Sequence, residues 1–259
     1  MQEELNLAIV QTALIWEKPE ENRNHLEKLI SSASDTVDLV VLPEMFSTGF
    51  TMNPEPIAET MDGPSVSWMQ QMAISKNMAL CGSLVIQENE QYYNRLIFVQ
   101  PNGRLTYYDK RHTFTLAGEH TVYTAGSKKL IVTYKGWRIC PLICYDLRFP
   151  VWARNVEDYD LLIYVANWPV QRIKAWDSLL QARAIENMVY CAGVNRIGLD
   201  ANNYEYNGHS AVYDVLGECL VMAKENSEEL LELTLSKAHI NKYRKKLQFL
   251  NDRDDFTIR

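Results

Sequence analysis

Short apolar runs of strand length alternate along this chain with longer segments in which apolar residues recur at helical spacing. Nearly every position of LNLAIVQ at 5–11 is apolar, whereas 18–34 repeats apolar residues every three or four positions among charged ones. Pro64 suits the first turn of a further helix, because its missing N–H has no helical partner to lose there. We therefore expect helices over 18–34, 64–77, 149–157, 174–188 and 237–247.

Several other apolar runs follow one another with only a turn between them. Pro101-Asn102-Gly103 and Lys135-Gly136 each separate two such runs, which is typical of β-hairpins. The polar segment 111–128 has no clear period and is expected to be an irregular loop. The strands that we expect cover 5–11, 38–44, 79–86, 92–100, 104–110, 129–134, 137–144, 159–167, 191–198, 209–215, 218–225 and 229–236.

This mixture of hairpins and strand–helix units, with helices towards both ends, predicts an α/β fold in which two sheets pack together and helices cover them. No internal repeat, low-complexity segment or proline-rich linker interrupts the pattern. We expect a single domain over 1–259, with a core of about 4–235 and a C-terminal helical extension over 236–259.

The composition is that of an ordinary globular protein, with 47% hydrophobic and 23% charged residues among 259. The net charge is −7 and the one basic block is YRKKLQ at 243–248, so nucleic acid is not an expected partner. No apolar run approaches the roughly 20 residues of a membrane span. The first residues carry glutamates where a secretory signal carries lysine or arginine. We expect a cytoplasmic protein with no membrane partner.

Five cysteines are scattered along the chain, and in a reducing compartment disulfides are rare. Cys140 and Cys144 stand four apart in CPLICYDLRFP, but a zinc site needs further Cys or His ligands at short spacing. The histidines are scattered and without evident partners, so we expect no metal. Strand-core positions are expected for Cys81, Cys140, Cys191 and Cys219.

Cys144 differs from the others because it ends an apolar strand just before a predicted helix. Such a junction exposes the side chain and directs backbone N–H groups towards it, which favours a thiolate and an oxyanion. Free cysteine is also among the most frequently buried residue types. This stretch alone leaves both a nucleophile and a buried core residue open.

Other strand ends carry residues that suit catalysis, although each has an ordinary structural explanation. Glu44 closes the strand 38–44, where a raised pKa would make it a general base, but surface glutamates are common there. Lys110 and Glu119 lie in a polar region that is equally compatible with solvated turns. Asn167-Trp168 is either a pocket wall or a packed turn. The G-x-S-x-G, phosphate-loop and H-E-x-x-H motifs are all missing from the sequence.

Taken together, LPEMF with Glu44, DKRHTF with Lys110 and CYDLRFP with Cys144 resemble the Glu–Lys–Cys triad of the nitrilase (carbon–nitrogen hydrolase) superfamily. The resemblance extends through residue 235 and is closest to the bacterial ω-amidase branch. The strings that carry this closer match are YDKRHTF, AGEH with Glu119, PLICYDLRFPVWARN, YDLLIYVANWP and QARAIENMVYCAGVNRIG.

The resemblance implies a four-layer αββα sandwich, usually dimeric, that hydrolyses the terminal amide of 2-oxoglutaramate or 2-oxosuccinamate without a cofactor. It implies that Cys144 is the nucleophile and Glu44 the general base. Lys110 and the backbone N–H of Tyr145 would face the oxyanion, and Glu119 would orient the site. We expect Lys110 to help keep Glu44 and Cys144 ionised.

Substrate binding is expected to involve Asn167, Trp168, Phe114 and Arg148. Arg111 and Arg172 also flank the matched motifs, and the sequence offers no reason to prefer one arginine for the substrate carboxylate. Three alternatives stay open. They are another amide or nitrile substrate of the superfamily, a non-catalytic binding protein on the same fold, and a cysteine-ligated metalloprotein.

Overall fold

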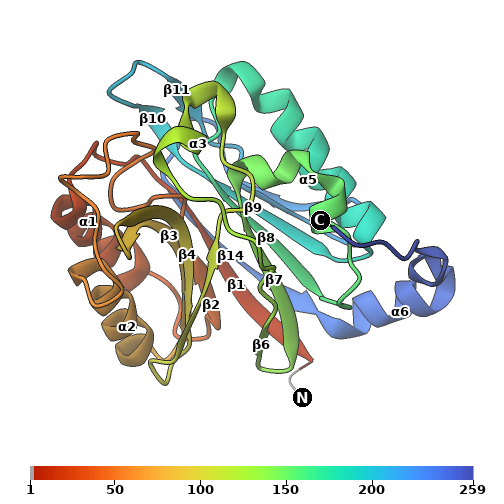
Figure 1. Cartoon of the computed structure of the whole chain (residues 1–259). Coiled ribbons are helices and arrows are strands. Elements are labelled where there is room, and N and C mark those ends of the chain that lie inside the picture. Colours follow the sequence, from red (N-terminus) through yellow and green to blue (C-terminus); the bar gives the residue numbers. More distant parts are fainter. Residues whose placement is uncertain (1–2, 259) are drawn as a thin grey trace.

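Two six-stranded β-sheets form the centre of the computed structural model, which describes residues 3–258 (Figure 1). In spatial order, the first sheet contains β14 (Glu229–Ser236), β1 (Glu4–Gln11), β2 (Leu39–Val41), β3 (Ala79–Glu88), β4 (Gln91–Val99) and β5 (Leu105–Asp109). The second contains β13 (Cys219–Met222), β12 (Ala211–Tyr213), β9 (Tyr190–Asn195), β8 (Leu161–Ala166), β7 (Trp137–Ile143) and β6 (Val132–Tyr134). A separate hairpin joins β10 (Ile197–Leu199) and β11 (Glu205–Asn207).

Helices cover the outer faces of both sheets. The α-helices are α1 (Pro19–Ser31), α2 (Pro64–Lys76), α3 (Glu119–Val122), α4 (Pro150–Ala153), α5 (Ile173–Asn187) and α6 (Lys237–Leu247). Short 3₁₀ turns are η1 (Thr115–Ala117), η2 (Cys144–Arg148), η3 (Val170–Arg172) and η4 (Phe249–Asp252). Figure 1 shows α1 and α2 on one side of the molecule and α5 on the other, which makes four layers. The predicted αββα sandwich is confirmed.

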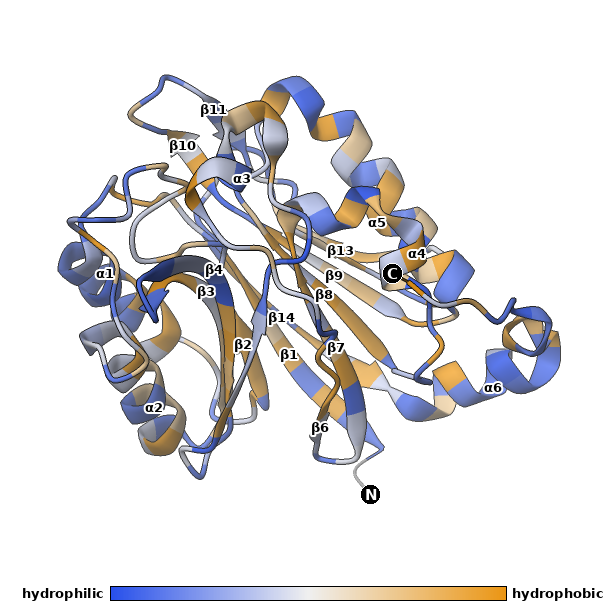
Figure 2. Ribbon diagram, viewed as in Figure 1, coloured by the Kyte–Doolittle hydropathy of each residue, from blue (hydrophilic) through white to orange (hydrophobic). Residues whose placement is uncertain are grey.

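The apolar runs arise because the central strands are buried on both faces. In β1, Leu7 and Ile9 contribute to the core between the two sheets. The alternate residues Ala8 and Val10 pack instead with apolar residues of α1 and α2. Figure 2 shows the result, with hydrophobic residues along the central strands and hydrophilic residues on the outer faces of the helices.

Parallel pairing places the ends of several strands at one edge. β1, β2 and β3 pair in parallel in the first sheet, and β7, β8 and β9 do so in the second. The carboxyl ends of parallel strands lie at the same edge of a sheet, where α/β proteins build their sites. The loops that follow β2, β7 and β8 therefore lie close together.

Two sequence-based boundaries were wrong. The helix expected over 149–157 is only α4, because Arg154 leaves helical geometry with φ −56° and ψ 131°. The strand expected over 191–198 is interrupted at Arg196, and the β10–β11 hairpin that follows was not predicted. The interruption comes directly after Asn195, whose side-chain amide donates to the Trp168 and Gly208 carbonyls.

Among residues 3–258, no helix combines the length and the apolar character that crossing a membrane would need.

Candidate active site

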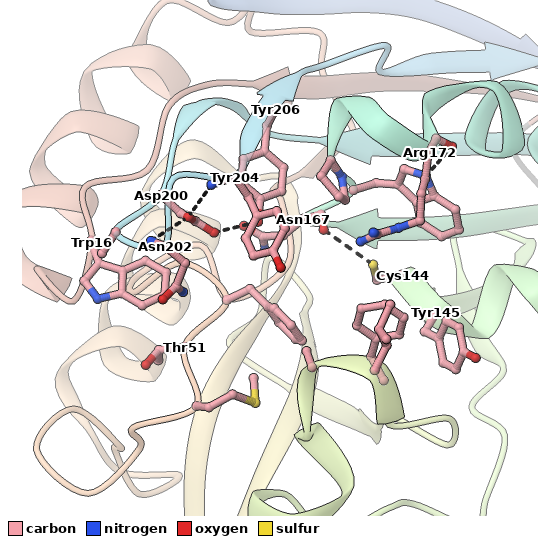
Figure 3. A pocket seen from close by; sticks show the side chains of 18 of the residues that line it. Trp16, Thr51, Cys144, Tyr145, Asn167, Arg172, Asp200, Asn202, Tyr204 and Tyr206 are labelled. Carbon is pink, nitrogen blue, oxygen red and sulfur yellow. Dashed lines mark hydrogen bonds between the residues drawn. The ribbon is translucent and has the colours of Figure 1, made fainter.

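Four predicted site residues lie at or just behind one pocket although they are far apart in the sequence. Lys110, Cys144 and Asn167 directly follow β5, β7 and β8, and Glu44 lies just beyond β2. The pocket measures about 750 Å³, and Lys110, Cys144 and Asn167 line it. Figure 3 shows the Cys144 sulfur directed towards Asn167 at one end of this pocket. Glu44 lies buried behind that wall.

Cys144 occupies a strained turn that a buried aspartate holds in place. The φ of Cys144 is +42°, a left-handed conformation that non-glycine residues rarely adopt and that concentrates at functional sites. The Asp146 carboxylate accepts hydrogen bonds from the Ile143 N–H (3.0 Å) and the Tyr108 hydroxyl (2.7 Å). It also contacts the backbone N–H (3.0 Å) and Nδ1 (2.8 Å) of His112. One side chain thus fixes both the Cys144 turn and the loop after Lys110.

Lys110 joins two buried carboxylates. Its Nζ donates to Glu44 Oε1 at 2.8 Å and to both oxygens of Glu119, at 3.0 and 2.9 Å. The Lys110 side chain is 1% exposed, and both glutamates are fully buried. The Phe114 N–H donates a further bond to Glu119. Each charge is therefore paired and hydrogen-bonded, as burial of ionised groups requires.

Glu44 is held by further donors on the opposite side. Asn94 Nδ2 donates to Glu44 Oε1 at 2.8 Å, and the Asn167 N–H donates to Glu44 Oε2 at 2.8 Å. Asn167 Nδ2 also binds the Glu44 carbonyl at 2.7 Å. The next residue, Met45, has φ +44°, so this turn is strained like that of Cys144.

The electrostatics of the cluster differ from the expectation of a resting thiolate. Burial and the charges of Glu44 and Glu119 raise the pKa of the Cys144 thiol well above its ordinary value, and Lys110 offsets them only in part. These contributions favour the protonated thiol, whereas the sequence had suggested a thiolate. Burial lowers the pKa of Lys110, but Glu119 and Glu44 more than offset this and raise it, so the ammonium stays charged. Burial also raises the pKa of Glu119.

Aromatic rings and two arginines form the walls beside Cys144. The rings of Phe114 and Tyr145 lie 4.9 Å apart. The Arg148 guanidinium lies 4.8 Å from the centre of the Trp168 ring, and that of Arg172 lies 5.2 Å from the Phe114 ring. All five side chains line the pocket, as predicted for Phe114, Trp168 and Arg148.

The third arginine that the sequence suggested lies elsewhere. Arg111 donates to the Gly126 carbonyl and packs over Trp152, and it does not line the pocket, so it was wrong as a candidate for binding a substrate carboxylate. Within residues 3–258, neither Arg148 nor Arg172 has an ion pair with a carboxylate. Two cationic groups are thus available to an anionic ligand.

Several pocket residues had not been predicted. Phe50 and Ala201 line the pocket, and its end away from Arg172 is formed by Trp16, Asp200, Asn202, Tyr204 and Tyr206 (Figure 3). Except for Tyr206 in β11, they come from segments outside the helices and strands, which carry no periodic signal. Asn94 was also missed, although a buried amide in the apolar strand YYNRLIFVQ was a detectable signal.

The other cysteines differ in burial, and four of the histidines pair with carboxylates. Cys81, Cys140 and Cys191 are buried in strands as predicted, but Cys219 is exposed, because β13 is the edge strand of its sheet. The expectation that the histidines lack partners was wrong. Each of four contacts a carboxylate: His25 (Glu228), His112 (Asp146), His209 (Asp177 and Glu225) and His239 (Asp214).

Known proteins share this chain's sequence and fold. The carbon-nitrogen hydrolase family model matches residues 6–245. A protein of Yersinia enterocolitica named omega-amidase YafV is 42% identical over 258 residues, which cover 98% of both chains. A protein of Bacillus subtilis (strain 168) named 2-oxoglutaramate amidase is 33% identical over 228 residues, covering 86% of this chain and 87% of that protein.

The crystal structure of XC1258 from Xanthomonas campestris superposes with a TM-score of 0.97 at 41% identity, and the match covers 100% of both chains. That protein is described as a CN-hydrolase superfamily member with an arsenic adduct in its active site. The family match spans nearly the whole sequence, and the fold agrees throughout. This chain therefore belongs to the carbon–nitrogen hydrolase family.

Proposed function

We propose that this protein is an ω-amidase that hydrolyses the terminal amide of 2-oxoglutaramate or 2-oxosuccinamate to a 2-oxo acid and ammonia. The observation that carries the proposal is that Cys144 and Lys110 line one pocket and that Glu44, buried behind its wall, is hydrogen-bonded to Lys110. The named activities of the relatives from Yersinia and Bacillus support the choice of substrate.

In the first half-reaction the Cys144 sulfur attacks the amide carbonyl carbon while Glu44 takes the thiol proton. The raised pKa of Cys144 favours the protonated thiol, so a base is needed to take its proton during the attack. The oxyanion that forms faces the Lys110 ammonium and the Tyr145 N–H, and a preorganised donor of this kind contributes roughly 10²–10³ in rate. The C–N bond then breaks, the proton on Glu44 passes to the leaving nitrogen, and ammonia leaves a thioester.

In the second half-reaction Glu44 removes a proton from water, which attacks the thioester carbon. The second tetrahedral oxyanion faces the same donors, Lys110 and the Tyr145 N–H. The C–S bond breaks, the proton returns to the sulfur, and the carboxylic acid leaves. Glu119 keeps Lys110 in position throughout, since it accepts two of the hydrogen bonds that the ammonium donates. No step needs a metal or an organic cofactor.

The substrate carboxylate is proposed to bind Arg148 and Arg172, which line the pocket without a carboxylate partner among the described residues. Guanidinium groups bind carboxylates through paired hydrogen bonds. Phe114 and Trp168 hold these arginines from one side and would pack against the carbon chain. Asn167 would close the pocket beside the reacting carbonyl.

The test is ammonia release from 2-oxoglutaramate and 2-oxosuccinamate beside propionamide, glutamine, an N-carbamoyl amino acid, deaminated glutathione and a nitrile. We expect the two 2-oxo acid amides to give the highest kcat/KM. Turnover of 2-oxoglutaramate no faster than propionamide would remove the ω-amidase assignment. Full activity in Cys144→Ala would remove the nucleophile, and no hydrolysis of any compound would favour a binding protein.

Arg172 provides a test of carboxylate binding within the same assay. Arg172→Ala should raise KM for 2-oxoglutaramate at least tenfold and leave KM for propionamide unchanged. Only 2-oxoglutaramate has a carboxylate that would lose its guanidinium partner. An equal loss on both substrates would mean that Arg172 has a structural role.

We also propose that the protein acts in the cytoplasm as a homodimer. Exposed apolar residues on α5, β13 and the preceding turn would suit a second copy of the chain: Ile185, Leu216, Leu220 and Met222. Sedimentation velocity tests the assembly, and a monomer at micromolar concentration would contradict it.

A further inference from the structure

Asn94 hydrogen-bonds to both of the buried carboxylates that Lys110 joins. It belongs to β4, and its side chain is 1% exposed. Its Nδ2 donates to Glu44 Oε1 at 2.8 Å and to Glu119 Oε1 at 3.2 Å. Lys110 Nζ donates to the same two oxygens. The carboxylates are therefore bridged twice, once by a cation and once by a neutral amide.

The orientation of the Asn94 amide is fixed by Ser83 in β3. Ser83 Oγ accepts a hydrogen bond from the Met45 N–H at 2.8 Å, so its own proton points to Asn94 Oδ1, 2.9 Å away. This assigns oxygen and nitrogen in Asn94 from the network, because only the nitrogen can donate to the carboxylates. Three hydrogen bonds therefore connect the Met45 N–H, next to Glu44, through Ser83 and Asn94 to the Glu44 carboxylate.

This hydrogen-bond network determines which oxygen of Glu44 is available for proton transfer. Oε1 accepts from both Lys110 and Asn94, which uses its two lone pairs. Oε2 accepts one short bond, from the Asn167 N–H at 2.8 Å, and one long, weak contact from Asn167 Nδ2 at 3.5 Å. It therefore keeps a lone pair for the proton of the Cys144 thiol or of the hydrolytic water.

We propose that Ser83 and Asn94 form a positioning pair that orients Glu44 and leaves its Oε2 as the oxygen that exchanges protons with Cys144 and water. The pair acts through the carboxylates and does not touch the substrate. This inference rests on the proposed amidase function, because it assigns the base of that reaction.

The neutral Asn94 amide suits its position between Glu44 and Glu119 for an electrostatic reason. The titratable groups around the carboxylates are Lys110, Cys144 and Tyr123, whose hydroxyl donates to the Thr51 carbonyl. Lys110 already balances one of the two negative charges. A second cation would suppress the basicity that Glu44 needs, whereas amide N–H groups stabilise the ionised form without adding a charge. Removing them makes the carboxylate pair bind a proton more tightly.

The test measures kcat/KM against pH for the amide that the wild-type enzyme hydrolyses best, in Asn94→Ala, Ser83→Ala and the double variant. We expect Asn94→Ala to move the acid limb about one pH unit upward and to lower the plateau at least tenfold. Ser83→Ala should cause a smaller shift in the same direction. The double variant should shift the acid limb by less than the sum of the two single shifts, because Ser83 and Asn94 belong to one hydrogen-bond network.

Asn155→Ala is the matched structural control. Asn155 is also fully buried and makes side-chain hydrogen bonds with the backbone of Tyr159 and Asn187, but it contacts no carboxylate. It should lower the thermal midpoint without moving the acid limb. An unmoved limb in folded Asn94→Ala, or an equal shift in Asn155→Ala, would overturn the proposal, as would a double variant with additive shifts.

Alkylation of Cys144 by iodoacetamide separates this inference from the proposed function. If the wild-type enzyme hydrolysed no amide, the function would fail but the positioning pair would still be testable. Loss of the amide donors changes the negative charge that the carboxylates present to the thiol, so the alkylation curve of Asn94→Ala should shift along the pH axis relative to that of the wild type. A curve that coincides with those of the wild type and Asn155→Ala would overturn the positioning role.

Discussion

Replacing Lys110 with methionine removes the only cation that hydrogen-bonds to Glu44 and Glu119 among the described residues. The ammonium donates three hydrogen bonds of 2.8 to 3.0 Å to two fully buried carboxylates. Breaking a buried ion pair by removing one partner costs about 3–5 kcal/mol. Because one ammonium serves two carboxylates here, we expect the free energy of unfolding to fall by about 5 kcal/mol at pH 8.

This loss should depend on pH in a defined direction. Burial already raises the pKa of Glu119, and Lys110 is the group that lowers it, so the Lys110→Met variant raises it further. A carboxyl group that binds its proton more tightly when folded contributes stability at low pH and loses it as pH rises through the folded pKa. The stability deficit should therefore be about 1–2 kcal/mol smaller at pH 5.5 than at pH 8.

Urea denaturation followed by tryptophan fluorescence at both pH values measures the effect. Lys110→Met/Glu119→Gln is the control, because it removes one charge of each sign and should recover about half of the loss at pH 8. Both Lys110 variants should lack amidase activity. A deficit that is the same at both pH values, or a double variant no more stable than the single one, would refute the buried-charge reasoning.

Four further substitutions separate catalytic, positioning and packing roles. Glu44→Gln should lower kcat by roughly 10²–10⁴, yet speed alkylation of Cys144 at pH 7, because the charge that raises the thiol pKa is removed; slower alkylation would contradict this. Asp146→Ala leaves four contacts unpaired, so urea denaturation should show a loss of about 2–4 kcal/mol, and an unchanged stability would exclude the anchoring role. Cys140→Ser should cost about 1–3 kcal/mol by burying an unpaired hydroxyl, whereas Cys219→Ser at the exposed edge should stay within about 0.5 kcal/mol; equal thermal midpoints for the two would contradict the assigned burial.

Local patterns in the sequence were sufficient to predict the strands whose residues are buried at a regular spacing. The central strands read as apolar runs because both of their faces are covered, and the turns at Pro101-Asn102-Gly103 and Lys135-Gly136 carry residues that suit hairpins. The expected strand ends also placed Glu44, Lys110 and Cys144 where loops gather. Sheet edges and irregular segments were harder to predict from the sequence. The exposure of Cys219 depends on its strand having a neighbour on one side only, and the β10–β11 hairpin has no distinctive period.

The sequence by itself therefore determined the layered α/β architecture and, through its ordered motifs, the three candidate catalytic side chains. Only the tertiary structure decided how they act together. Glu44 and Lys110 are 66 positions apart yet share a 2.8 Å hydrogen bond, and Asn94 reaches both carboxylates from another strand. The upward shift in the pKa of Cys144 also follows only from the tertiary structure. A pKa depends on burial and on the sum of all nearby charges in space, and neither quantity is present in a local pattern.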